Sequence, residues 1–186
     1  VAALEAGLAG ARVIIADEQS EFGGTLLASN EKFDGQSAND WLVAIFSQLT
    51  SLRNVKCLTR STVFGYYDHN FVTILGRLTD HLGITASSGP RQCMHRVRAK
   101  QVVLATGALE RPLVFAHNDI PGVMQASSVS TYINRFSVSP GNKLVLATNN
   151  DNAYRTAIDW HNAGREVVAV VDSRYSPNGD LVKKTE

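Results

Sequence analysis

Cysteine is scarce in this sequence. The 186 residues include only Cys57 and Cys93, which form no C-x-x-C pair and show no spacing typical of metal ligands. This scarcity argues against a disulfide framework and against a zinc or redox-cysteine site. We therefore expect a protein of a reducing compartment, the cytoplasm, with no bound metal.

The sequence also lacks a long apolar run and an excess of charge of either sign. No stretch approaches the roughly 18 to 20 apolar residues of a membrane-spanning helix, and no signal peptide is recognisable. Eighteen Lys and Arg against 17 Asp and Glu leave a net charge of +1, which favours neither nucleic acid nor a membrane surface as a partner. With 44% hydrophobic residues, the chain can form one large domain or a domain and a half.

A helix, a buried strand and an acid follow one another at the start of the chain. Residues 1–8 carry a helical apolar stripe, with Ala and Gly where a sheet would press close. Residues 13–16 are a continuous apolar run, typical of a parallel strand, and end at Asp17. This order is the second half of a strand–helix–strand unit that binds dinucleotides. Because the G-x-G-x-x-G loop and a helix N-cap are both missing, we expect the chain to be a fragment.

Asp17 is the candidate ribose ligand. A carboxylate at the carboxyl end of the second strand can accept hydrogen bonds from both ribose hydroxyls and repels a 2′-phosphate, which favours NAD or FAD over NADP. Glu18, one residue out of register, is a weaker candidate. Gly23 and Gly24 would let the backbone pass close to a ligand. The alternative is that the acid only closes the strand and the glycines only form a loop.

The middle of the chain predicts a helix followed by short strands. The helix covers residues 41–52, behind capping residues at 37–40. Strands follow at 54–58, 61–67 and 71–75, the last two joined by a turn containing His69. The basic stretch 91–100 is typical of a solvated edge strand rather than a phosphate-binding patch.

Residues 99–112 form a second candidate ligand-binding segment. A buried apolar strand is predicted at 102–104, and it runs into small residues that include Thr106 and Gly107. Open α/β sheets bind ligands at the carboxyl ends of their strands, and small residues there let the backbone come close to the ligand. A tight turn without a ligand is the alternative interpretation.

A second strand–helix–strand pattern follows a boundary near residue 138. It predicts strands at 143–147 and 167–171 and a helix at 153–162, and the second strand closes at Asp172. Thr148, Asn150 and Ala153 stand where a dinucleotide loop would have glycines, so we interpret this site as structural or weakened. The predicted domains are 1–138, a first dinucleotide-binding domain, and 139–186, the start of a second.

Several segments resemble one particular family. Over nearly its whole length the chain is similar to flavoproteins of the disulfide-reductase type, in which the first dinucleotide domain contains a three-stranded crossover and an ATG turn. More narrowly, it resembles the amino-terminal part of the alpha subunit of heterotetrameric sarcosine oxidase. The segments that carry this resemblance are ADEQSEFGGTLL, TVFGYYDHN, RVRAKQVVLATGALERPLVFAHNDIPGVM, TYIN and ATNNDNAYRTAIDW.

The resemblance implies a fold, cofactors and partners. The fold is an α/β, Rossmann-like FAD/NAD(P)-binding domain with a three-stranded crossover, plus the start of a second Rossmann-like domain. The family oxidatively demethylates sarcosine to glycine and forms hydrogen peroxide. Its alpha subunit binds NAD, its beta subunit carries FAD, an FMN lies between subunits, and gamma and delta subunits complete the complex. By motif, Asp17 is implied as the ribose ligand, and Gly23, Gly24, Thr106 and Gly107 as backbone lining.

Two other functions remain open. The first is an FAD-binding subunit of a related amine or opine dehydrogenase, or of an NAD(P)H-dependent oxidoreductase. The second is a non-catalytic scaffold domain. No residue of this chain is a persuasive acid, base or nucleophile, so any chemistry is expected to lie mainly on another subunit.

Overall fold

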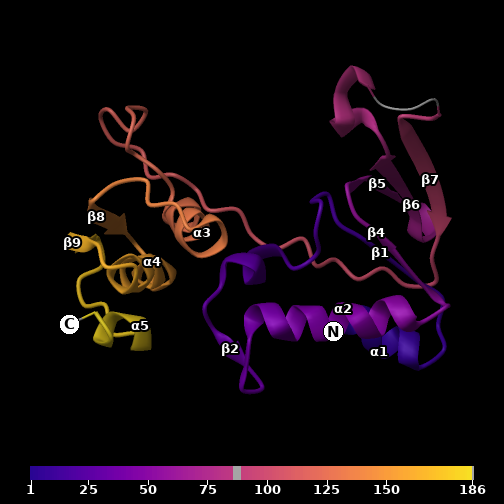
Figure 1. The fold of residues 1–186 in the computed structure, drawn as a ribbon, viewed down its shortest axis with the longest axis horizontal. Coiled ribbons are helices and arrows are strands. Elements are labelled where there is room, and N and C mark those ends of the chain that lie inside the picture. The colour runs from indigo at the N-terminus through magenta and orange to yellow at the C-terminus, as the bar shows by residue number, and fades with distance from the viewer. Residues whose placement is uncertain (86–88, 186) are drawn as a thin grey trace. The chain divides into compact units, whose positions relative to one another are not determined.

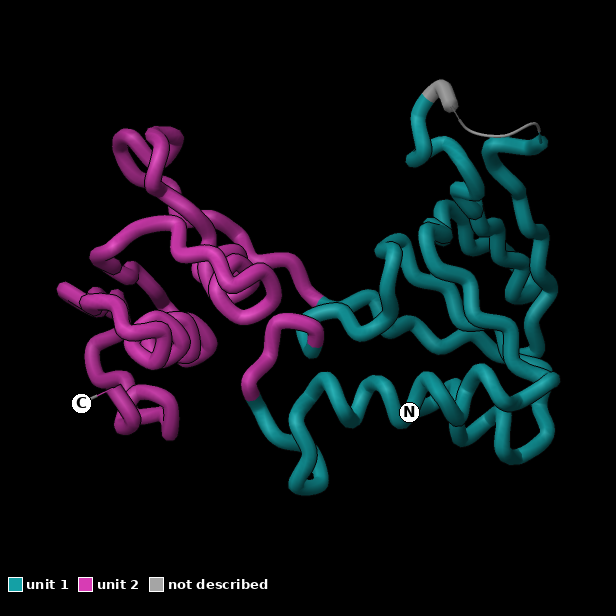
Figure 2. Tube along the Cα trace, viewed as in Figure 1, with its two compact units in different colours: residues 1–26, 31–107 teal, residues 27–30, 108–186 magenta. Residues whose placement is uncertain are grey.

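The chain forms two compact units in the computed structural model, which describes residues 1–85 and 89–185. Unit 1 comprises Val1–Leu26 and Glu31–Gly107, and unit 2 comprises Leu27–Asn30 and Ala108–Glu186 (Figure 2). The two units are defined by contacts within the chain. The predicted boundary at 138/139 separates two dinucleotide-binding domains instead, and it stays a prediction. Within the described residues, no helix is long and apolar enough to cross a membrane.

Unit 1 contains the predicted helix and strand at the start of the chain, together with a second helix and strand that pack against them. Figure 1 shows the two helices side by side next to the two strands. The strands pair in parallel, from Val13 opposite Val55 to Ala16 opposite Leu58. A Cβ at Gly7 would lie 2.6 Å from Val55 Cγ2, so only glycine permits this close approach. The elements are α1 (Ala2–Leu8), β1 (Val13–Ala16), α2 (Ala38–Ser51) and β4 (Val55–Leu58).

The segment between β1 and α2, residues 17–37, is mostly irregular. It contains the 3-10 turn η1 (Gly24–Ala28) and the antiparallel pair β2 (Lys32–Phe33) and β3 (Gln36–Ser37). Ser37 caps α2, because its Oγ accepts a hydrogen bond from the Asp40 N–H at 3.1 Å. The capped helix predicted from the sequence is therefore confirmed.

A three-stranded antiparallel sheet follows β4, as the three-stranded crossover predicts. The strands are β5 (Ser61–Tyr67), β6 (Phe71–Arg77) and β7 (Gln92–Arg98), in the order β5-β6-β7. The turn η2 (Asp68–Asn70) joins the first two, with exposed His69 at φ 58°, and η3 (Asp80–Thr85) follows β6. The strand β7 pairs only with β6 in the described chain and alternates between exposed and half-buried residues. The prediction of a solvated edge strand is confirmed.

The buried strand predicted at 102–104 is wrong. In the described chain this segment pairs with no strand, since β1 and β4 pair only with each other. Val103 and Leu104 are 73% and 70% exposed. An apolar run becomes a buried strand only when a neighbouring strand accepts its backbone hydrogen bonds, and no strand of the described chain does so.

Unit 2 contains the second strand–helix–strand pattern, confirmed as a parallel pair with a crossover helix. Its elements are α3 (Ala126–Phe136), β8 (Lys143–Thr148), α4 (Asn152–Asn162), β9 (Glu166–Asp172) and α5 (Asp180–Lys183). Leu146, Ala153 and Ala157 form its buried core, against which apolar residues of α3, β8 and β9 pack. Trp160 is only 2% exposed, and its indole N–H donates to the Glu166 carbonyl at 3.0 Å.

Asn134 of α3 explains why residues 27–30 belong to unit 2. Its side-chain amide donates to the Ala28 carbonyl at 3.0 Å and to Asp159 Oδ2 at 2.9 Å. Its Oδ1 accepts a hydrogen bond from Asn30 Nδ2 at 2.8 Å. One side chain therefore joins three segments that are far apart in the sequence.

Candidate functional site

Asp17 lies directly after β1, at the carboxyl end of the parallel pair, and its backbone is held from both sides. Its N–H donates to the Leu58 carbonyl at 2.9 Å, and its carbonyl accepts from the Ser61 N–H at 2.8 Å. The half-buried carboxylate accepts a hydrogen bond from the Gln19 N–H through Oδ1 at 2.9 Å. In the described chain, no hydrogen bond engages the other oxygen, Oδ2. The site therefore presents a positioned carboxylate with free acceptor capacity.

The neighbouring residues fix the turn that carries this carboxylate. Arg60 N–H donates to the Gln19 carbonyl at 2.7 Å, and Arg77 Nη2 donates to the Glu18 carbonyl at 3.2 Å. Glu18 itself is exposed. The turn uses the backbone of Glu18, so its carboxylate stays a secondary candidate for the ribose.

Gly23 and Gly24 adopt φ values of 134° and 53°. Residues with a Cβ rarely adopt such values. At Gly24 a Cβ would have no neighbour within 4 Å, so the glycine is required by the backbone conformation and not by lack of space. Their contact with a ligand stays a prediction.

Thr106 and Gly107 are not brought to the Asp17 carboxylate by any hydrogen bond in the described chain. Both are exposed, and Gly107 has a φ of 69°. They follow the segment that forms no strand, so nothing in the described chain holds them at a sheet edge. Their role as backbone lining stays a prediction.

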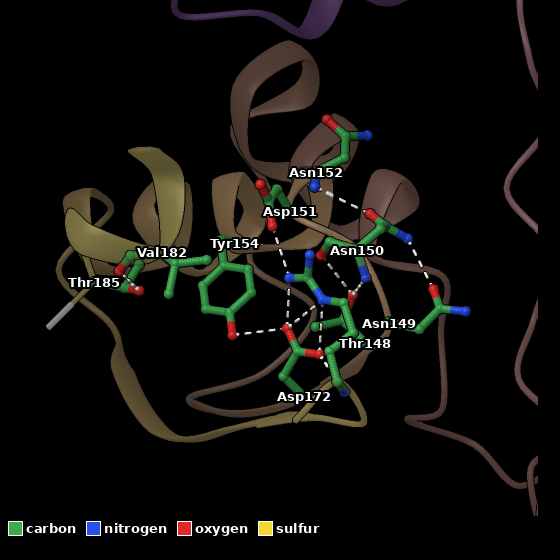
Figure 3. A network of polar contacts seen from close by, with 10 residues as sticks. Thr148, Asn149, Asn150, Asp151, Asn152, Tyr154, Asp172, Val182 and Thr185 are labelled. Carbon is green, nitrogen blue, oxygen red and sulfur yellow. Dashed lines mark hydrogen bonds and ion pairs between the residues drawn. The ribbon is translucent and has the colours of Figure 1, made fainter. Parts of the chain in front are cut away.

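The corresponding loop in unit 2 satisfies its own polar groups. Figure 3 shows the network of polar contacts around this loop, which follows β8. Thr148 Oγ1 donates to the Asn150 carbonyl at 2.9 Å and accepts from the Asn150 N–H at 3.1 Å. Asn150 Oδ1 accepts from the Asn152 N–H at 3.0 Å, at the start of α4. These residues stand where a dinucleotide loop would offer backbone N–H groups to a phosphate.

Asp172, at the end of β9, is already bound by side chains of this chain. Arg174 donates to Asp172 Oδ1 from Nε at 3.0 Å and to Oδ2 from Nη2 at 2.7 Å. Arg174 Nη2 also lies 2.6 Å from Asp151 Oδ1, and the Tyr154 hydroxyl donates to Asp172 Oδ2 at 3.0 Å. We call these four residues the Arg174 cluster. Sequence reasoning missed it, and the only signal was the arginine two positions after the acid.

The cluster perturbs the titration of its members. Hydrogen bonds from Arg174 hold the pKa of Asp172 well below its usual range. The bonds to Asp172 and then to Asp151 raise the pKa of Arg174. Burial, followed by the hydrogen bond to Asp172, raises the pKa of Tyr154. The ion pair between Arg174 and Asp172 therefore persists throughout the physiological pH range.

Two parallel strand–helix–strand arrangements and a three-stranded antiparallel insert define the fold as Rossmann-like α/β. It matches the crystal structure of L-proline dehydrogenase from P. horikoshii with a TM-score of 0.71 at 23% identity, covering 95% of this chain and 34% of that one. No protein-family model matches the chain.

The chain is similar in sequence to several curated proteins. The alpha subunit of sarcosine oxidase from Rhizobium meliloti (strain 1021) is 46% identical over 179 residues, which are 96% of this chain. An opine oxidase subunit from Agrobacterium tumefaciens (strain Ach5) is 28% identical over 181 residues, 95% of this chain. The chain spans 18% of the length of the first protein and 35% of the second.

Proposed function

We propose that this chain is the dinucleotide-binding part of the alpha subunit of a sarcosine-oxidase-type enzyme and that it holds NAD in unit 1. The observation that carries the proposal is the positioned Asp17 carboxylate at the carboxyl end of β1, with Oδ2 free to accept. The 46% identity to the alpha subunit of a sarcosine oxidase supports the choice of family.

The residues of unit 1 fit an adenosine ribose. Asp17 Oδ1 accepts one backbone N–H, which leaves Oδ2 and a second lone pair on Oδ1 for the two ribose hydroxyls. The negative charge disfavours a 2′-phosphate, so NAD fits better than NADP. In this proposal Glu18 lies at the rim, and Gly23, Gly24, Thr106 and Gly107 line the dinucleotide with their backbone.

The proposal extends to the whole complex. Beta, gamma and delta subunits are the partners, FAD lies on the beta subunit, and FMN lies between subunits. The complex oxidises sarcosine to glycine with formation of hydrogen peroxide, and this segment alone is inactive. Flavin supplies the redox chemistry when bound, while residues of this chain bind and orient a dinucleotide. The free cysteines agree with a cytoplasmic location.

The test uses the full-length subunit co-expressed with its partners. The purified complex is denatured, and the released nucleotides are identified by mass spectrometry. NAD affinity is then measured for Asp17→Asn, which keeps the acceptor for Gln19 but removes the charge. We expect NAD and flavin in the wild type and an affinity about 10- to 100-fold lower in the variant, as for loss of one or two charge-assisted hydrogen bonds.

Asp119→Ala is the control, because this exposed carboxylate lies outside the proposed site. Equal loss of NAD in both variants would refute the assignment of Asp17. Complexes that release flavin without NAD would refute NAD as the ligand.

A second candidate function is the FAD-binding subunit of an opine-oxidase-type enzyme. The 28% identity to an opine oxidase subunit favours it. Release of FAD alone from this subunit, with oxidation of an opine rather than sarcosine, would establish that function. A complex that retains no nucleotide on this subunit would support the scaffold alternative.

A further inference from the structure

In each unit, a parallel strand that follows a helix ends at an aspartate, and the two aspartates form the same turn. Asp17 follows β1 and accepts the Gln19 N–H two residues later at 2.9 Å. Asp172 ends β9 and accepts the Arg174 N–H, also two residues later and also at 2.9 Å. The two carboxylates therefore start from matching turns, each at the carboxyl end of a parallel strand that follows a helix, which is where a dinucleotide fold places its ribose ligand.

The side chain at the second position distinguishes the two turns. In unit 2 the Arg174 guanidinium bonds both oxygens of Asp172, and the Tyr154 hydroxyl adds a further donor to Oδ2. The Asp172 side chain is only 6% exposed. A ribose would have to displace the guanidinium to reach it, and buried Asp172 would then lose its cationic partner, which is unfavourable.

The charge at the neighbouring helix end also opposes a dinucleotide. Asp151 stands at the N-cap of α4, where a pyrophosphate would bind in an open site. In the described chain its carboxylate makes no capping hydrogen bond to the helix and lies 2.6 Å from Arg174. Asp151 and Asp172 outnumber Arg174, so the cluster has a net charge of −1 and repels phosphate.

The segment after β9 packs against this same cluster. A Cβ at Gly179 would collide with the Asp151 carboxylate, so the backbone lies directly against it. Val182 of the following helix α5 is 5% exposed. The Arg174 cluster thus joins the β8–α4 loop, the end of β9 and the segment leading to α5.

We propose that Arg174 closes the carboxyl edge of unit 2 to a dinucleotide by acting as an internal ligand of Asp172, which leaves unit 1 as the binding site within these 186 residues. The location in unit 1 rests on the proposed function. The closure of unit 2 stands on the geometry of the Arg174 cluster.

Hydrogen–deuterium exchange on the full-length protein in its complex tests both parts separately. With added NAD, we expect slower exchange in peptides covering 13–28 and no change in those covering 148–154 and 172–182. Without NAD, Arg174→Gln should speed exchange in 172–182 by about tenfold or more, since local opening becomes easier. Arg174→Lys should restore part of the protection, because it keeps the charge but not the bidentate geometry.

Arg165→Gln is the matched control, since the side chain of this arginine donates to exposed Asn142 at 3.0 Å, away from the Arg174 cluster. Protection of 148–154 by NAD, or NAD binding that depends on Asp172, would overturn the closure of unit 2. No protection anywhere by NAD would overturn the proposed function alone. Unchanged exchange in 172–182 for Arg174→Gln would overturn the role of Arg174.

Discussion

Replacing Asn134 by alanine should loosen α3 within unit 2. The substitution removes two half-buried hydrogen bonds, to the Ala28 carbonyl and to the Asp159 carboxylate, and one exposed bond to Asn30. The bond to a neutral carbonyl contributes about 1 kcal/mol and the bond to a carboxylate about 2 kcal/mol, while the exposed bond adds little. We expect a loss of about 3 kcal/mol in the local free energy of opening of α3.

Hydrogen–deuterium exchange of peptides covering 126–136 measures this change. A loss of about 3 kcal/mol corresponds to exchange roughly 100-fold faster, at 1.36 kcal/mol per factor of ten. Asn30→Ala is the matched control, because it removes only the exposed bond. Acceleration of less than about fivefold for Asn134→Ala, or equal acceleration in the control, would refute the role given to this side chain.

Three further predictions concern unit 2. Trp160→Phe keeps a buried ring but loses the bond to the Glu166 carbonyl, so the thermal unfolding midpoint of unit 2 should fall, with about 1 kcal/mol lost; an unchanged midpoint would contradict this. Glu110 accepts from the Ala126 and Ser127 N–H groups at 3.0 and 2.8 Å, so Glu110→Ala should destabilise the start of α3 by about 1 kcal/mol, measured as faster exchange there. The pKa of Asp172 is lowered on folding, so its stabilising contribution is present above the unfolded pKa of about 4 and is lost as pH falls below it. Acid unfolding should therefore depend less on pH in Asp172→Asn, and an unchanged pH profile would count against the ion pair.

Local patterns were sufficient to predict most helices and strands. The apolar run 13–16 becomes β1, and Ser37 caps α2, because both features depend on residues close in the sequence. The hairpin around His69 follows from turn residues between two alternating runs. The parallel pairing of β8 and β9 follows in the same way from a strand, a helix and a second strand in succession.

The segment 102–104 shows where such patterns are insufficient. Its apolar residues match a buried strand as well as residues 13–16 do, yet Val103 and Leu104 are largely exposed. The difference is the presence of a neighbour: β1 has β4 to accept its hydrogen bonds, whereas no strand of the described chain pairs with 102–104. Pairing between distant segments is not encoded in a local apolar run.

The two acids at strand ends show a second limit of prediction from the sequence. This limit concerns where side chains lie, not which strands pair. In the sequence, Asp17 and Asp172 are equivalent, since each closes an apolar strand after a helix. The residue two positions later is Gln19 after the first acid and Arg174 after the second, and in the sequence an arginine there could equally well extend into solvent. Tyr154 and Asp151, which hold Arg174 in place, come from α4 and the loop before it. Whether an acid at this position is available to a ribose is therefore decided by tertiary contacts, and a motif that reads only the strand and its acid assigns a ligand to both units alike.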